Sequence, residues 1–253
     1  MRRIFRSFVS MPNLKTGDYM QKFYKHAGVK ETEKGFQVLL DGRGIKTPER
    51  NNVILPTEIL ALGVATEWQV QDKFIRTSSM PLFQLSATAI DLSHTGIRPQ
   101  LTERIHQFLQ NDSICYREDE QEKSDRQTKL FTPVINHVKE KYGIELSTCS
   151  GFSTPQISKE SFDNLQKHIE TLDSFEIVAL EAATTIAKST SVGLSLLDGF
   201  LSIENSLKCS RLEEDLQIEA YGKVEGHHDL DELSSLVVLA AAKTLISFKN
   251  FNS

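Results

Sequence analysis

Residues 177–200, IVALEAATTIAKSTSVGLSLLDGF, form the most apolar stretch of the chain. Three charged side chains interrupt this stretch, namely Glu181, Lys188 and Asp198. A membrane-spanning segment would have to bury all three charges in hydrocarbon, which is costly. The stretch therefore predicts a buried helix in a helical domain, and no membrane insertion.

Helical periodicity extends on both sides of this stretch, from about residue 93 to the C-terminus, with apolar side chains three and four residues apart. Gly143 suits a helix end, and Ser158 and Asp173 or Ser174 suit helix starts. Small residues at 179–187 and 240–242 would let helices cross closely. The apolar stripes are Ile97–Leu109, Leu130–Tyr142, Phe162–Leu172, Ala179–Ala187, Leu201–Tyr221 and Leu230–Phe248. Six helices without a strand signal predict an all-α orthogonal helix bundle over residues 93–253.

The preceding part of the chain mixes short strand patterns with one helix. Residues 36–40 are rich in β-forming side chains, and Asp41-Gly42 after them is typical of a tight hairpin turn. Further strands are expected at 22–25 and 53–55, and an extended segment or turn at 78–85. Thr57 can cap a helix whose buried stripe contains Leu60, Val64 and Trp68. Residues 19–92 are therefore predicted to form a small α+β domain with an antiparallel sheet.

The first residues carry the features of a targeting segment. Arg2, Arg3 and Arg6 alternate with bulky apolar residues, and the first acidic residue is Asp18. On a helix, the arginines and the apolar groups can separate to opposite sides, as in a mitochondrial transit peptide. Residues 1–18 are therefore predicted to be a transit peptide, with a basic tail that carries no address as the alternative.

The overall composition narrows the class of protein. The chain has 253 residues, of which 39% are hydrophobic and 25% charged, so that a collagen-like or wholly disordered chain is excluded. The 29 Lys and Arg residues against 34 Asp and Glu give a net charge of −5, which does not favour binding to nucleic acid. An odd number of cysteines, three, without a C-x-x-C motif fits a reducing compartment.

Two groups of residues are candidates for a site of chemistry. His227, His228 and Asp229 lack the spacing of a tetrahedral metal site. Asp229 precedes Glu232 by three residues, which instead predicts a structural role at a helix start. A nucleophile at Cys115 with His106 as its base has no orienting motif. We expect no catalytic residue, no metal and no cofactor, and a small metal-dependent or cysteine hydrolase stays open as the alternative.

An acidic run stands out near the end of the chain. Between the apolar Leu212 and Leu216, and just after them, lie four acidic residues: Glu213, Glu214, Asp215 and Glu219. Neighbouring carboxylates repel one another, and no basic residue follows Glu213 or Asp215 four positions later. The run is either a solvated helix face or a docking patch for a protein partner.

Several peptides together resemble one family, the mitochondrial assembly chaperones for the α subunit of the ATP synthase F(1) sector. No single peptide is diagnostic, but the ordered set extends from about residue 20 to about residue 230. The matching segments are Lys22-Phe-Tyr24, Leu40-Asp-Gly-Arg43, Lys46-Thr-Pro48, Leu55-Pro56, Ala65-Thr-Glu-Trp68, Met80-Pro-Leu82, Asp112, Ile114-Cys-Tyr-Arg117, Ser210-Arg-Leu-Glu-Glu214, Gln217-Ile218, Gly222, Glu225 and His228-Asp229.

The resemblance implies a non-enzymatic chaperone of the mitochondrial matrix. Such a protein binds the unassembled α subunit, prevents its aggregation and promotes assembly of the α/β hexamer. It also implies an N-terminal α+β domain followed by an orthogonal helix bundle. The functionally important glutamate of the family's L-E-E motif corresponds to Glu213, so the acidic run becomes the expected partner-binding site. The family's tryptophan corresponds to Trp68, for which a structural role is expected.

Overall fold

The computed structural model describes residues 20–151, 153–222 and 228–251, without the side chains of residues 228 and 229. The predicted transit peptide lies outside these residues. By its internal contacts the chain divides into two compact units: residues 1–96 with 244–253, and residues 97–243. The sequence-based domains 19–92 and 93–253 stay a prediction, and each unit is described by itself below.

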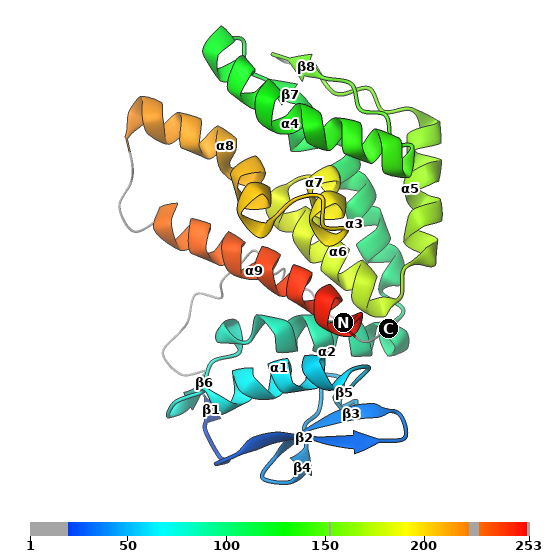
Figure 1. The fold of residues 1–253 in the computed structure, drawn as a ribbon, viewed down its shortest axis with the longest axis vertical. Helices are drawn as coiled ribbons and strands as arrows, with labels where there is room; N and C mark the ends of the chain where they lie inside the picture. Colours follow the sequence, from blue (N-terminus) through cyan, green and yellow to red (C-terminus); the bar gives the residue numbers. More distant parts are fainter. Residues whose placement is uncertain (1–19, 152, 223–227, 252–253) are drawn as a thin grey trace. The chain divides into compact units, whose positions relative to one another are not determined.

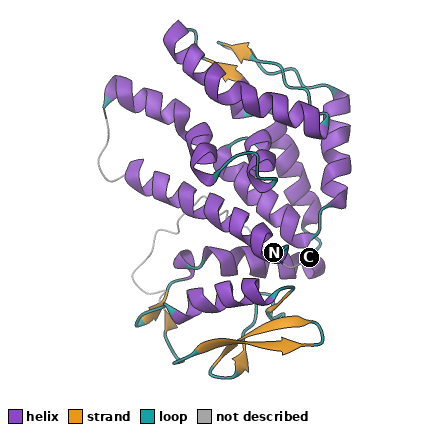
Figure 2. Ribbon diagram, in the orientation of Figure 1, coloured by secondary structure: helices purple, strands orange, loops and turns teal. Residues whose placement is uncertain are grey.

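The first unit contains the antiparallel sheet that the sequence predicts (Figures 1 and 2). At Asp41 and Gly42 the backbone has φ of 46° and 80°, and Leu40 pairs with Arg43 across this turn. Both positive φ values are those of the tight hairpin expected for Asp-Gly. The central strand β3 (Gly35–Leu40) pairs with β2 (Ala27–Thr32), β4 (Arg43–Gly44) and β5 (Ile54–Leu55), and β1 (Met20–Gln21) pairs separately with β6 (Phe74–Ile75).

The strand expected at residues 22–25 is wrong. Strand β1 ends at Gln21 and β2 begins at Ala27. Between them, the backbone N–H groups of Lys25 and His26 donate to the Asp41 carboxylate, at 3.1 and 2.9 Å, instead of to a neighbouring strand. A side chain of the hairpin turn therefore holds this segment.

Helix α1 (Glu58–Gln69) follows the sequence pattern closely. The Thr57 side chain accepts a hydrogen bond from the backbone N–H of Leu60 at 3.3 Å, which confirms the predicted N-cap. The buried face of α1 includes Leu60, Val64 and Trp68, and the helix packs on β2 and β3. The predicted buried stripe is therefore confirmed.

The extended segment or turn expected at residues 78–85 is wrong from Pro81 on, because Pro81 starts a helix there. After a 3₁₀ turn (Thr77–Ser79), helix α2 runs over Pro81–Thr95. Proline suits the first helical position, since its backbone nitrogen needs no acceptor there. Met80 provides no side-chain cap, and the Glu67 carboxylate of α1 takes that role by accepting the N–H groups of Leu82 and Phe83 at 2.8 and 2.7 Å.

The second unit is mainly helical, as predicted, with α6 at its centre (Figure 1). Nine residues of α6 are buried, and the helix packs against α3, α7 and α8. Its helices are α3 (Arg98–Gln110), α4 (Gln121–Tyr142), α5 (Lys159–Thr171), α6 (Ser174–Ala187), α7 (Thr190–Leu197), α8 (Ile203–Tyr221) and α9 (His228–Lys249), of which α9 is in this unit up to Lys243. The described residues contain no helix long and apolar enough to cross a bilayer.

Several helix ends lie where the sequence places them. Gly143 ends α4 with a left-handed φ of 65°, and Ser158 caps α5. Asp173 caps α6 in a reciprocal capping box with Glu176. These termini depend on neighbouring residues only, which is why local sequence predicts them.

The apolar stretch at residues 177–200 is divided into two helices. Lys188 ends α6 with a φ of 52°, and Ser189 caps α7 through the backbone N–H of Val192 at 3.0 Å. Gly193 lets the two helices approach, because a Cβ atom there would lie 2.7 Å from the Thr184 hydroxyl oxygen. The sequence predicts burial of this stretch but not the break.

The other two charges of this stretch have partners within the unit. Glu181 forms an ion pair with Arg104 of α3 at 2.5 Å. The Asp198 carboxylate lies 2.7 Å from His137 Nε2 and accepts the Tyr142 hydroxyl at 2.9 Å, both from α4. Each charge therefore links the central stretch to a surrounding helix, as buried charges require.

The expectation that this half contains no strands needs one correction. Strand β7 (Tyr116–Arg117) pairs in parallel with β8 (Cys149–Ser150), and a 3₁₀ turn (Ser113–Cys115) precedes β7 (Figure 2). Two-residue strands carry no alternation pattern, so periodicity cannot reveal them.

Candidate partner-binding site

Helix α8 presents the predicted acidic run on its outer side. Leu212 and Leu216 are buried in a hydrophobic cluster that includes Phe131 and Val134 of α4. The Ser202 side chain caps the start of α8 by accepting the N–H of Asn205 at 3.1 Å. The i, i+4 pattern thus leaves the intervening acidic side chains outside the core.

Two of the four acids are paired with a buried arginine that the sequence interpretation overlooked. Arg211 is 5% exposed, and its guanidinium lies 2.9 Å from Glu214 and 3.9 Å from Asp215. The ammonium group of Lys188 also lies near Glu214, at 3.7 Å from its carboxylate. Arg211 precedes Glu214 and Asp215 by three and four residues, a spacing at which a base also stabilises an acid on a helix, so the sequence contains this signal.

A third acid, Glu219, is also paired within the chain. Arg126 of α4 donates to both of its carboxylate oxygens, at 2.6 and 3.0 Å. This bidentate hydrogen bond lowers the pKa of Glu219 and raises that of Arg126. The pair joins α4 to α8 across 93 residues of sequence.

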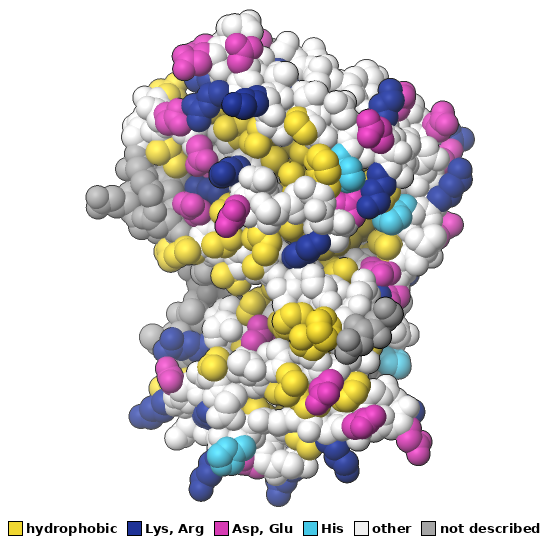
Figure 3. All heavy atoms as spheres, in the orientation of Figure 1, with side chains coloured by type: hydrophobic (Ala, Val, Ile, Leu, Met, Phe, Trp, Pro, Cys, Tyr) yellow, Lys and Arg dark blue, Asp and Glu magenta, His cyan; other side chains and the backbone are white. Residues whose placement is uncertain are grey.

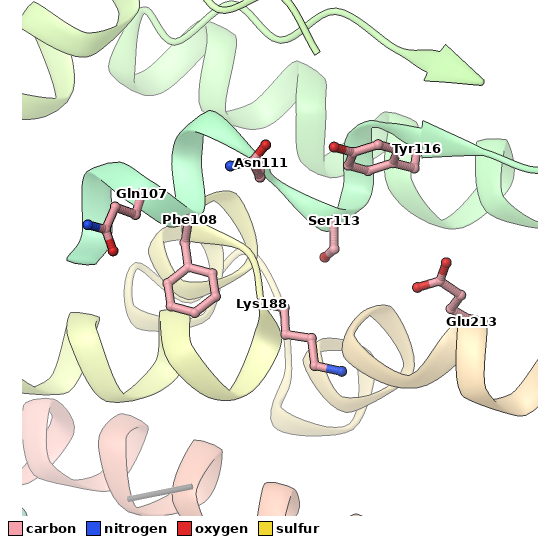
Figure 4. A pocket seen from close by; sticks show the side chains of 7 residues that line it. All are labelled: Gln107, Phe108, Asn111, Ser113, Tyr116, Lys188 and Glu213. Atoms are coloured by element: carbon pink, nitrogen blue, oxygen red, sulfur yellow. The ribbon is translucent and has the colours of Figure 1, made fainter. Parts of the chain in front are cut away.

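Glu213 differs from the other three acids. Its side chain is exposed, and within the described residues it makes no hydrogen bond or ion pair. It borders a hollow of about 480 Å³ in the second unit, and Figure 4 shows its carboxylate directed toward the side on which Ser113 and Tyr116 lie. The hollow is lined by Gln107, Phe108, Asn111, Ser113, Tyr116, Lys188 and Glu213.

The walls of this hollow combine apolar and polar surface. Phe108, near the end of α3, and Tyr116, in β7, supply two partly exposed aromatic rings. Asn111 and Ser113 add polar groups between them. The volume lies in the range of small ligand sites, about 300–1,000 Å³. The hollow is therefore large enough for a long side chain of a partner.

A row of exposed apolar residues lies on the first half of α9. Leu230 and Leu233 are each 58% exposed and Val237 is 45% exposed, and their spacing places them on one helix face. Figure 3 shows apolar side chains along this part of the molecule with acidic ones beside them. Burial raises the pKa of Asp215 of α8, and the charge of Glu232 of α9 adds to the increase, whereas Arg211 opposes it.

Of the two residues with expected structural roles, Trp68 and Asp229, the structure describes the side chain of Trp68 alone. Trp68 is 8% exposed and belongs to the core of the first unit. Helix α9 is described from His228 on, and the side chain of Asp229 lies outside the described residues. The capping role of Asp229 stays a prediction.

The features considered for catalysis give no support to a hydrolase. Cys115 is buried, and burial raises the pKa of its thiol far above the ordinary value, which disfavours the reactive thiolate. Among the described residues, no group of three or more His, Cys, Asp or Glu side chains could hold a metal ion. The role of the acidic run as a partner-binding site stays a prediction.

The comparisons with known proteins agree on one family. Residues 21–139 match the model of the ATP12 chaperone protein family. A relative in Schizosaccharomyces pombe, "Protein atp12, mitochondrial", is 26% identical over 223 residues, which cover 83% of this chain and 77% of the relative. "Protein ATP12, mitochondrial" of Saccharomyces cerevisiae is 28% identical over 257 residues, with 84% and 79% covered.

A solved structure extends this similarity to the fold. The crystal structure of Atp12 from Paracoccus denitrificans matches with a TM-score of 0.82 and 25% identity, covering 91% of this chain and 98% of that chain. The match therefore includes both the antiparallel sheet and the helices. The chain is therefore similar to the ATP12 chaperone protein family in sequence over residues 21–139, and to Atp12 in fold over 91% of its length. This similarity is to a family of chaperones and not to an enzyme family.

Proposed function

We propose that this chaperone binds the unassembled α subunit of the mitochondrial ATP synthase F(1) sector. It prevents aggregation of that subunit and promotes its assembly with the β subunit into the α/β hexamer. Two observations support the client: the ordered peptides that resemble this family, and the match of residues 21–139 to the ATP12 chaperone protein family.

The proposal fits a general problem of oligomer assembly. A subunit made before its partners exposes the surface that will later be buried between subunits. Such surfaces are more apolar than ordinary protein surface, and they cause aggregation. A chaperone must cover part of this surface and must later be displaced by the permanent partner.

The observation that carries the proposal is the exposed apolar row of Leu230, Leu233 and Val237 on α9, in the same unit as the acidic run of α8. The three apolar side chains supply a contact that favours association with an apolar client surface. The acidic residues supply polar contacts that orient the client and favour encounter, while adding modest affinity. A small apolar contact with a charged border suits a complex that must be released.

The proposed location is the mitochondrial matrix. The basic and apolar pattern of the first residues is that of a transit peptide, and the two curated relatives carry "mitochondrial" in their names. Import of a fluorescent protein fused to residues 1–18, followed by separation of matrix and membranes, tests this part.

The client is tested by producing the F(1) α subunit in bacteria with and without this chain. We expect more soluble α subunit when both are produced, and recovery of the α subunit with affinity-tagged chaperone. Equal amounts of insoluble α subunit in both cultures would contradict the proposal.

A pair of matched variants tests the surface. Leu233→Ser removes an exposed apolar side chain from the row, and Leu62→Ser removes one of similar exposure, 48%, from α1 in the first unit. We expect Leu233→Ser alone to reduce recovery of the α subunit, with thermal unfolding of both variants close to that of the parent. Equal recovery by both variants would exclude the row as the contact.

A further inference from the structure

The hollow beside Glu213 has a composition that restricts what can occupy it. Its two aromatic rings, Phe108 and Tyr116, lie on separate elements of the second unit. Its carboxylate comes from a third element, α8 (Figure 4). Aromatic faces together with a carboxylate are the groups that bind an organic cation, through cation–π contact and a charge-assisted hydrogen bond.

The charges around the hollow leave one negative charge uncompensated. Glu214 and Asp215 share the buried Arg211, and Lys188 at the edge of the hollow lies 3.7 Å from Glu214. Glu219 is paired with Arg126. Within the part of the chain that the structure describes, the carboxylate of Glu213 alone in the acidic run has no cationic partner.

We infer that the hollow receives an arginine side chain of the client protein, whose guanidinium pairs with Glu213. The apolar stem of an arginine would lie against Phe108 and Tyr116. Its planar head is less strongly hydrated than an ammonium group and can both stack on a ring and make a bidentate pair with the carboxylate. Asn111 and Ser113 supply oxygen atoms that can accept its remaining N–H groups.

The other occupants fit the charges less well. An anionic side chain would approach Lys188, which is already engaged by Glu214, and would be repelled by Glu213. A purely apolar side chain would cover Glu213 without giving it a partner, which is costly for a charged group. The identity of the client rests on the proposed function, but the chemistry of the hollow does not.

A small-molecule titration tests the hollow without the client. The ¹⁵N-labelled chain is titrated with N-acetylarginine methylamide, and its backbone amide shifts are followed by NMR. N-acetylcitrulline methylamide is the control, because it has nearly the same shape without the charge. We expect saturating shifts for residues 107–116 and 188 with the arginine compound, and at least about tenfold weaker binding of the citrulline compound.

Two variants assign the effect to Glu213. Glu213→Gln should weaken binding of the arginine compound about tenfold or more. Glu219→Gln, in which the changed residue lies outside the hollow, should leave binding within twofold. Equal binding of the two compounds, no effect of Glu213→Gln, or preferred binding of N-acetylglutamate methylamide would overturn the inference.

Charge reversal then connects the hollow with the client. Exposed arginines of the F(1) α subunit are changed singly to glutamate and each variant is combined with Glu213→Lys. We expect one of these variants to restore recovery with Glu213→Lys, and not with Glu219→Lys. Capture of the α subunit without any binding of the arginine compound would overturn the inference and leave the proposed function intact. Binding of the arginine compound without capture of the α subunit would contradict the proposed function and leave the chemistry of the hollow intact.

Discussion

The hydroxyl group of Tyr24 donates a hydrogen bond to the backbone carbonyl of Trp68 at 2.7 Å, and the two rings meet edge to face with centroids 5.8 Å apart. The ring of Phe83 of α2 also meets the indole edge to face, with centroids 5.1 Å apart. These contacts join the segment before β2, helix α1 and helix α2 within the first unit. Trp68 therefore lies where three parts of this unit meet.

Replacing Trp68 by alanine should destabilise the first unit strongly. We expect Trp68→Ala to lower the free energy of unfolding by about 3–5 kcal/mol, because a large buried aromatic is lost and a cavity remains. Within the described residues the indole N–H has no hydrogen-bond partner, so Trp68→Phe should cost much less. Urea unfolding followed by circular dichroism measures both, with Val70→Ala at a 66% exposed position as control. An unchanged midpoint for Trp68→Ala would exclude a structural role.

The Glu67 carboxylate that caps α2 should make stability depend on pH. Burial raises the pKa of Glu67 from 4.5 to about 7, although the N–H groups of Phe83 and Leu82 oppose the shift. Glu67 therefore keeps its proton to higher pH in the folded state than in the unfolded state. Its contribution to the free energy of unfolding is complete below pH 4.5 and is lost as the pH rises through about 7. At about 1.4 kcal/mol per pKa unit, the shift from 4.5 to about 7 corresponds to a loss of up to about 3.5 kcal/mol.

The comparison of Glu67→Gln with the parent isolates this effect. Glutamine does not titrate. Between pH 4.5 and 7.5 the parent should therefore lose stability relative to Glu67→Gln, measured as the difference between their free energies of unfolding. Trp68, the single tryptophan of the chain, reports unfolding of this unit by its fluorescence. Glu33→Gln, at an exposed position of the same unit, is the control for removal of one carboxylate. A parallel pH profile for parent and Glu67→Gln would rule out the raised pKa.

Much of the fold was predictable because its signals are local. Thr57, Ser158 and Asp173 cap the helices that directly follow them, and the Asp41-Gly42 turn needs only its own two residues. Helix α2 was not predictable in this way. Its cap is Glu67, which lies 15 residues before Leu82 in the sequence, so the pattern around Met80-Pro81 resembled a turn.

The candidate site was predictable only in part, for the same reason. The amphipathic pattern places all four acids of α8 outside the core. Glu214 and Asp215 pair with Arg211 of the same helix, but the partner of Glu219 is Arg126, which is 93 residues away in the sequence. The hollow beside Glu213 combines α3, β7, α8 and the α6–α7 break, and no single segment contains its pattern.

Asp112 is expected to hold together the start of α7. It is fully buried, and its carboxylate accepts the backbone N–H and the hydroxyl of Ser191 at 3.0 and 2.8 Å. Asp112→Ala leaves a buried N–H without an acceptor and should cost about 1–3 kcal/mol. Thermal unfolding followed at 222 nm measures the change, with Asp163→Ala at an exposed position of α5 as control. Equal midpoints for the two variants would show that the contact is dispensable.

Charge reversal along α8 should separate the free acid from a paired one. Glu213→Lys should reduce capture of the F(1) α subunit at least about tenfold, because it puts a cation where the client is proposed to place one. Its stability should stay within about 0.5 kcal/mol of the parent, since the side chain is exposed and unpaired among the described residues. Glu219→Lys breaks the exposed pair with Arg126, which costs little stability, and should leave capture within about threefold.

Pull-down at two salt concentrations measures both variants. If the two reduced capture equally, the net charge of α8 would matter and not the position of Glu213. If neither did, the acidic run would be a solvated helix face.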